Sequence, residues 1–202
     1  MTKTLFKKEK GFTLVEVLIA VTIFSIAVTG IITATVQSGM SINDAKYRTE
    51  ANYLAGEGIE LVRAMRDSYV LANLVPSDGW THFIDDFYTV CSGPCDVDAF
   101  NDLNSSSALI HANNGTSIIP CVQSTGYNTC QLNYDTTTGF YKHNFNSVSL
   151  SPFTRTITIP PLPVGATTTN ELQLTVTVSW KEGVSTQSVT MNESLFNWYS
   201  YH

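Results

Sequence analysis

The sequence predicts an α+β protein, in which a long N-terminal helix packs on a C-terminal antiparallel sheet to form a globular head with a disulfide-linked loop. Three observations support this fold class. An uncharged apolar run covers residues 17–36, and a helical spacing of apolar residues continues beyond it. Near the C-terminus, apolar and polar residues alternate along two segments joined by a glycine-containing connection, which is typical of a β-hairpin.

The composition of the 202-residue chain, 43% hydrophobic and 14% charged, is that of a folded protein with one core. Met1–Gly11 contains four lysines and one glutamate, a charge of +3, so the remainder carries −9 within the total of −6. Because phosphate binding requires clustered basic side chains, this acidic remainder disfavours nucleic acid as a partner.

The apolar run Val17–Val36 is long enough to cross a bilayer as one helix. The lysines before it predict that its N-terminal end stays in the cytoplasm and that the C-terminus lies outside. A plain signal anchor and a secretory signal peptide are the alternatives, but no good small-x-small cleavage site follows the run. Four hydroxyl residues share one face of this helix, either to pack against other helices or to bond to their own helix: Thr22, Ser25, Thr29 and Thr33.

The junction before the apolar run reads KGFTLVEVLIA over residues 10–20. This junction resembles the signal of type IV pilins and type II secretion pseudopilins. The resemblance implies that a prepilin peptidase cleaves between Gly11 and Phe12 and that the new Phe12 amine is N-methylated. It also implies that the apolar segment is retained as the core of a filament and that the head has a pilin-like fold.

Glu16 is an acidic residue near the head of the lipid-spanning segment. Such a residue costs on the order of 2–3 kcal/mol to insert unless it is paired. The resemblance implies that Glu16 pairs with the N-terminal amine of a neighbouring subunit during assembly, and burial of this pair would set the register. The alternative is an acid at the membrane surface without a partner.

Helical periodicity continues beyond the membrane segment and predicts one helix from about residue 12 to about residue 68. We therefore expect a leader at 1–11, a membrane or filament-core helix at 12–36, its amphipathic continuation at 37–70 and a head at 71–202. The apolar face of the continuation is formed by residues at alternating steps of four and three: Tyr47, Ala51, Leu54, Gly58, Leu61 and Met65.

Residues 71–150 are rich in Asn, Ser, Gly and Asp, and we expect an extended loop with a few short strands, such as 139–143. All the cysteines lie here: Cys91, Cys95, Cys121 and Cys130. Four cysteines allow three disulfide connectivities, of which pairing within the two short local loops is the simplest. Zinc is the alternative, but these spacings fit no common zinc module.

The last quarter of the chain predicts a sheet of three or four strands. Residues 155–159 alternate, and residues 172–180 form a half-buried strand. The segment 181–183 is read as a three-residue connection, with 184–191 as the returning strand. Three apolar residues are expected to cover the core after this hairpin: Leu195, Phe196 and Trp198.

The sequence contains none of the common hydrolase, zinc-protease or phosphate-loop motifs, so we expect no enzyme and no cofactor. A weak calcium candidate is formed by Asp96, Asp98 and Asp102, although an acidic solvated loop explains their spacing better. The histidines are scattered, and each is expected at the surface: His82, His111, His143 and His202.

With the resemblance, these features indicate a structural subunit, a minor pilin more than a major one, of a type IV pilus or pilus-like filament. The alternatives are a type II secretion pseudopilin, a competence pilin and, in a different class, a membrane-anchored adhesin. The resemblance implies other pilin subunits, a prepilin peptidase and an inner-membrane assembly platform as partners, with membrane lipid before assembly. The precursor would lie in the inner membrane, and the mature subunit in a surface or periplasmic filament.

Overall fold

The computed structural model of the chain describes residues 11–72, 76–98, 118–124, 127–137, 139–143, 150–161 and 170–198. The chain divides into two compact units, Met1–Ala45 and Lys46–His202. Within the described residues a long N-terminal helix, a second helix and an antiparallel sheet give the α+β, pilin-like fold that the sequence predicts.

Helix α1 extends over Leu14–Ala72 and has 59 residues. Its part within the first unit is apolar, and its large side chains are exposed from Leu14 to Ile42. In the described part of the chain, α1 is the helix that is long and apolar enough to cross a membrane. Large apolar side chains exposed along a helix favour lipid or other helices over water as their surroundings.

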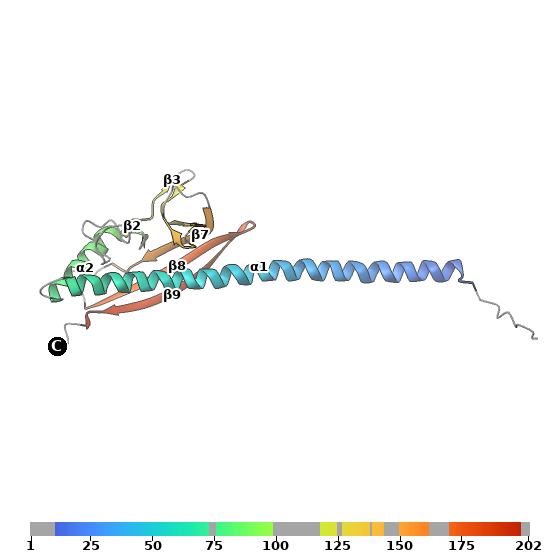
Figure 1. Cartoon of the computed structure of the whole chain (residues 1–202), viewed down its shortest axis with the longest axis horizontal. Helices are drawn as coiled ribbons and strands as arrows, with labels where there is room; N and C mark the ends of the chain where they lie inside the picture. The colour runs from blue at the N-terminus through green and yellow to red at the C-terminus, as the bar shows by residue number, and fades with distance from the viewer. Residues whose placement is uncertain are drawn as a thin grey trace, which may run out of the picture. The chain divides into compact units, whose positions relative to one another are not determined.

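In the second unit, α1 buries the face that the periodicity predicts. Ala51, Leu54, Gly58 and Met65 are buried there, while Tyr47 and Leu61 are partly buried. The helix ends at Ala72, four residues beyond the expected end near residue 68. Figure 1 shows this part of α1 lying along strands β8 (Glu171–Glu182) and β9 (Ser185–Phe196).

Helix α2 (Pro76–Val90) replaces part of the loop expected over residues 71–150, so that prediction was wrong here. Trp80, Phe83, Ile84 and Phe87 recur at helical spacing and are all buried in the core. The three aromatic rings pack one after another in a tilted arrangement, with centroids 5.7 Å apart for Trp80 and Phe83 and 5.5 Å apart for Phe83 and Phe87. Packing against the head therefore stabilises a helix in a segment of modest helix propensity.

In the part of the chain that the structure describes, the main sheet has seven strands rather than the three or four expected. Besides β8 and β9, its strands are β1 (Cys95–Val97), β2 (Ile118–Pro120), β5 (Gln131–Tyr134), β6 (Tyr141–Lys142) and β7 (Leu150–Thr158). Their order is β2-β1-β7-β5-β6, and β8 pairs with both β7 and β9. Strands β3 (Gln123–Ser124) and β4 (Tyr127–Asn128) form a separate two-stranded ribbon.

The β8–β9 hairpin confirms the predicted alternation, but its turn is shorter than expected. Ladder pairing continues to Glu182 opposite Ser185, so the connection is Gly183-Val184 rather than residues 181–183. Gly183 has φ +60°, a left-handed conformation that glycine adopts without steric cost. Two-residue connections of this kind match the twist of the flanking strands.

The core lies between α1, α2 and one face of the sheet. Val176, Val178 and Trp180 of β8 are buried on this face, and Trp180 meets Phe153 of β7 edge to face at 6.1 Å. Leu195 is buried as expected, whereas Phe196 and Trp198 are exposed, so the prediction that all three cover the core was wrong.

Candidate functional site

Helix α1 begins with a capping arrangement at Thr13. The Thr13 hydroxyl accepts a hydrogen bond from the Glu16 backbone N–H at 3.3 Å, and the Thr13 carbonyl accepts one from Val17 N–H at 3.2 Å. Thr13 is therefore the N-cap residue, and Glu16 occupies the position that completes a Ser/Thr-x-x-Glu capping sequence. The carboxylate of Glu16 lies in the first helical turn, where the helix dipole favours negative charge.

The Gly11–Phe12 peptide bond lies outside the helix. Gly11, Phe12 and Thr13 have no regular secondary structure, and all three are exposed. Phe12 is 82% exposed, and a Cβ placed on Gly11 would meet nothing within 4 Å. An exposed, non-helical bond just before a capped helix is a suitable substrate for a peptidase.

A shallow groove on α1 surrounds Glu16. Apolar residues account for the rest of its lining: Phe12, Val17, Ala20, Val21 and Phe24. Because a carboxylate among apolar side chains is costly to desolvate, burial of this groove would require a positive group facing Glu16.

The hydroxyl groups on one face of α1 bond to their own helix, which is one of the two alternatives that the sequence leaves open. Each hydroxyl donates a hydrogen bond to a carbonyl of its own helix, 2.8 Å long for Thr22, Ser25 and Thr29 and 3.0 Å long for Thr33. Intrahelical bonding of this kind satisfies hydroxyl groups in apolar surroundings. The same face includes Gly30, where an added Cβ would meet nothing within 4 Å, so the helix surface is open to close approach by another helix.

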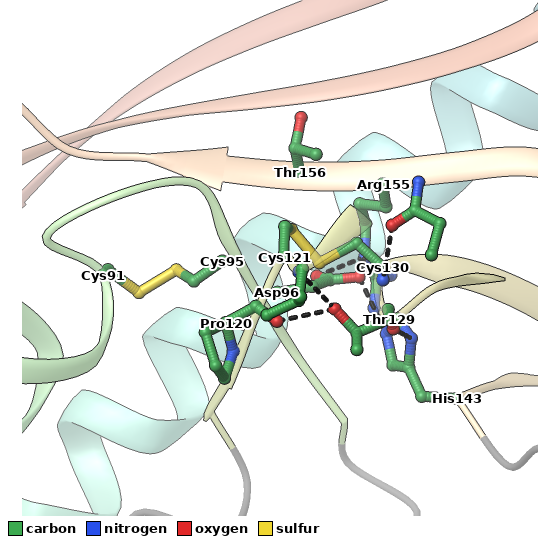
Figure 2. The surroundings of a disulfide bond; sticks show 12 residues. Cys91, Cys95, Asp96, Pro120, Cys121, Thr129, Cys130, His143, Arg155 and Thr156 are labelled. Carbon is green, nitrogen blue, oxygen red and sulfur yellow. Dashed lines mark hydrogen bonds and ion pairs between the residues drawn. A yellow bond between two sulfur atoms is a disulfide. The ribbon is translucent and has the colours of Figure 1, made fainter. Parts of the chain in front are cut away.

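The head contains a buried ionic cluster of Asp96, His143 and Arg155, shown in Figure 2. The guanidinium Nε of Arg155 lies 2.8 Å from Oδ1 and 3.0 Å from Oδ2 of Asp96. Nε2 of His143 lies 2.8 Å from Oδ2 of the same carboxylate. The prediction that His143 lies at the surface was wrong, because this residue is 3% exposed.

The cluster links three parts of the head. Arg155 Nη1 donates to the backbone carbonyl of Leu54 on α1 at 3.3 Å, and Nη2 donates to that of Val97 on β1 at 3.0 Å. His143 Nδ1 lies 3.0 Å from the carbonyl oxygen of Thr129, next to a disulfide cysteine. One buried cation thus connects the long helix to the sheet, and His143 extends this network to the cysteine loop.

The pKa of Arg155 is the net result of opposing effects. Burial, the largest single effect, would lower it, but the charges of Asp96, Glu57 and Asp98 and the hydrogen bond to Asp96 together outweigh burial and raise the pKa above the ordinary arginine value. Arg155 is therefore a permanent buried cation, whose stability depends on the Asp96 carboxylate.

The structure joins Cys91 to Cys95 and Cys121 to Cys130, which is the simplest of the three connectivities (Figure 2). The two disulfide loops are themselves linked, because the Cys121 N–H donates to the carbonyl of Pro94 at 2.8 Å. No cysteine remains as a thiol for metal binding. The disulfides therefore hold the short central strands together, in the region where the sequence predicts a disulfide-linked loop.

The weak calcium candidate is not supported by the position of Asp96. Its carboxylate is buried and is occupied by Arg155, by His143 and by the Val97 N–H at 2.8 Å. Asp98 is also buried, and Asp102 lies outside the described residues. Among the residues that the structure describes, no group of three or more His, Cys, Asp or Glu side chains is arranged to hold a metal.

The sequence predicts roles for Gly11, Phe12 and Glu16, and these roles stay predictions. Sequence reasoning missed Thr13, although its Thr-x-x-Glu spacing is a recognisable capping signal. It also missed the partnership of Asp96 with Arg155. These two residues are far apart in the chain, and no local pattern indicates that a β1 aspartate faces a β7 arginine.

A comparison with known protein families gives a match near the N-terminus. The family described as the Prokaryotic N-terminal methylation motif matches residues 6–32, which include the Gly11–Phe12 junction, Thr13 and Glu16. No curated protein and no solved structure is significantly similar to the chain.

Proposed function

We propose that the chain is a structural subunit of a type IV pilus or pilus-like filament. The reason is that it carries the N-terminal methylation motif, which is the prepilin signal of type IV pilins and pseudopilins. The match over residues 6–32 is the observation that carries this proposal. The long apolar helix and the pilin-like α+β head are consistent with it.

Processing of the precursor would remove the leader at 1–11 by cleavage between Gly11 and Phe12, followed by methylation of the Phe12 amine. The exposure of this bond outside α1 supports cleavage here. Residues 12–36 would then form the membrane or filament-core segment, 37–70 its amphipathic continuation and 71–202 the head. Retaining the apolar helix after cleavage gives the mature chain a membrane anchor until it assembles.

Assembly would pair Glu16 with the Phe12 amine of a neighbouring subunit. The carboxylate lies in an apolar groove on α1, and cleavage creates an amine at the start of the same segment in every copy. Each subunit would therefore supply one acid and one amine at a fixed spacing. Because an unpaired carboxylate is costly to desolvate, any register of the subunits that leaves Glu16 without an amine is disfavoured.

Within this class we favour a minor pilin, because the disulfide-linked central segment adds short strands and a second helix to the head. A type II secretion pseudopilin is the nearest alternative, and the same signal serves both. The subunit itself is assigned no catalysis; an inner-membrane platform would drive assembly, with the head outside. A single-helix adhesin that never assembles is the alternative from a different class.

Replacement of Glu16 by glutamine distinguishes a filament subunit from a simple anchored protein. Glu16→Gln keeps the shape of the side chain but removes the charge, so the protein should reach the membrane and be processed, yet yield at least about tenfold fewer sheared filaments. Immunoblots of membrane and sheared fractions measure both quantities.

Glu60→Gln is the matched control, since it neutralises an exposed acid further along the same helix. This variant should assemble normally. Filament yields for Glu16→Gln equal to those for Glu60→Gln would rule out the proposed role of Glu16.

A further inference from the structure

The face of the sheet opposite the core is rich in hydroxyl groups. Along β8 the buried residues alternate with Thr175, Thr177 and Ser179, and Thr154 and Thr156 of β7 are likewise partly exposed. The β7–β8 ladder places Thr154 opposite Ser179 and Thr156 opposite Thr177. This face therefore presents rows of neutral donors and acceptors to its surroundings.

A pocket of about 500 Å³ lies where this face meets the β3–β4 ribbon. The sheet register defines its floor: Gln131 is opposite Thr154, which is opposite Ser179. Lys181 lies two residues beyond Ser179 on the same face of β8, opposite Thr186 of β9. Gln123 and Asn128, a cross-strand pair of the ribbon, contribute the wall.

The ribbon wall is fixed to the head by covalent and hydrogen bonds. The Cys121–Cys130 disulfide closes its base. The Thr129 hydroxyl donates to the Pro120 carbonyl at 2.6 Å and accepts from the Val122 N–H at 2.7 Å. A wall held in this way gives a preformed pocket, which lowers the entropic cost of binding a ligand.

The chemistry of the pocket combines many neutral polar groups with one cation. Lys181 is the charged residue among those that line it in the described part of the chain, and the chain as a whole is acidic. Hydroxyl and amide groups spread over the ribbon and four strands both donate and accept, as the hydroxyls of a sugar do. A phosphate site would instead gather several cations, and a peptide site would need apolar recesses.

We propose that this pocket binds a saccharide unit that carries a carboxylate, with Lys181 pairing with the carboxylate and the side chains of Gln131, Thr154 and Ser179 bonding to sugar hydroxyls. This inference goes beyond assembly of the filament and does not depend on it. A pocket of this size is adequate for one or two sugar rings.

Matched acidic and neutral sugars test the proposal. The full-length protein, kept in a detergent without a sugar headgroup, is titrated with 3′-sialyllactose and with lactose, and binding is followed by saturation-transfer NMR and calorimetry. Sialyllactose should bind saturably and at least about tenfold more tightly than lactose, because a charge-assisted hydrogen bond to Lys181 is available to it alone. Lys181→Met should abolish that difference.

Two further variants make the result specific to the pocket. Lys46→Met removes an exposed lysine of α1 that does not line the pocket and should leave the tenfold preference intact. Ser179→Tyr places a bulky side chain on the floor and should weaken binding of both sugars. The proposal would be overturned if sialyllactose showed no saturable binding, or if it bound Lys181→Met as tightly as the native protein. It would also be overturned if inorganic phosphate or an acetylated pentaglutamate peptide bound as tightly as sialyllactose.

Discussion

At the scale of single residues, Arg155 makes the most consequential contacts in the head. Its guanidinium bonds to Asp96, to the carbonyl of Leu54 and to that of Val97, all within the interior. Removing one partner of a buried ion pair leaves the other charge uncompensated, which costs more than the pair itself contributes. The cluster is therefore a point at which a small chemical change should have a large effect on stability.

Arg155→Met should lower the free energy of unfolding by about 3–5 kcal/mol, because it leaves the Asp96 carboxylate buried without its cation. Arg63→Met is the control, since Arg63 pairs with Glu60 and Glu193 in a partly exposed setting and should cost under about 1 kcal/mol. Denaturant titration in detergent, followed by near-ultraviolet circular dichroism, gives both values. Equal costs for the two variants would contradict the account of the cluster.

Tyr141 should make the stability of the head sensitive to alkaline pH. Burial, and secondarily its hydrogen bond to Glu50, raise the pKa of Tyr141 well above the ordinary tyrosine value. Since the folded pKa is raised, the stabilisation is complete below about pH 10 and is lost as pH rises toward the folded pKa. The free energy of unfolding should therefore fall more steeply above about pH 10 in the native protein than in Tyr141→Phe.

Tyr53→Phe is the control for alkaline unfolding, because the Tyr53 ring is exposed on α1. Its unfolding profile should follow that of the native protein. If Tyr141→Phe and Tyr53→Phe give the same profile between about pH 9 and pH 12, the Tyr141–Glu50 contact does not contribute as described.

The sequence proposes an N-terminal site because its residues lie within a few positions of one another, and their roles stay predictions. Gly11, Phe12 and Glu16 form a contiguous pattern whose chemistry is local to one helix start. The buried cluster could not be predicted in the same way. Asp96, His143 and Arg155 belong to separate segments, and only the pairing of β1 with β7 brings two of them together.

At the scale of elements, α1 and the β8–β9 hairpin could be predicted because their periodicity is long and regular. Helix α2 was not predicted, although Trp80, Phe83, Ile84 and Phe87 have helical spacing. Gly79 and the aspartates lower its propensity, and tertiary contact decides the outcome. A Cβ on Gly79 would lie 2.5 Å from the Tyr69 carbonyl oxygen, so this glycine permits close approach of α2 to α1.

Gly56 and Gly58, two glycines of α1, test the packing of this helix on the sheet. A Cβ on Gly58 would lie 3.0 Å from Cδ of Arg155 and 3.1 Å from Cγ1 of Val176, whereas one on Gly56 would meet nothing within 4 Å. Gly56→Ala should stabilise the head by up to about 1 kcal/mol through helix propensity. Gly58→Ala should instead destabilise it, because the hydrogen bonds of Arg155 prevent that side chain from moving away.

Denaturant midpoints of the two alanine variants, measured side by side, provide the comparison. Equal stabilisation by both substitutions would show that the contact of Gly58 with Arg155 and Val176 is loose. The two substitutions are chemically identical, so the predicted difference in stability between the variants depends only on the position of Gly58 against the sheet.

At the scale of the whole molecule, the chain combines an exposed apolar helix with a head stabilised by its own core, two disulfides and a buried ion cluster. Most buried polar groups of the head bond to other groups of the head. Glu16, in contrast, lies in a groove on α1 that is otherwise lined by apolar side chains. This contrast is what a filament subunit requires, because the helix must find partners in other copies while the head remains folded before and after assembly.

Prepilin processing is the central claim, and the N-terminal sequence and intact mass of the protein from a producing cell envelope test it most directly. A chain that starts at Phe12 and carries one added methyl group is the predicted result. A chain that still starts at Met1, in cells where the prepilin peptidase is active, would contradict the account and leave a simple membrane-anchored protein.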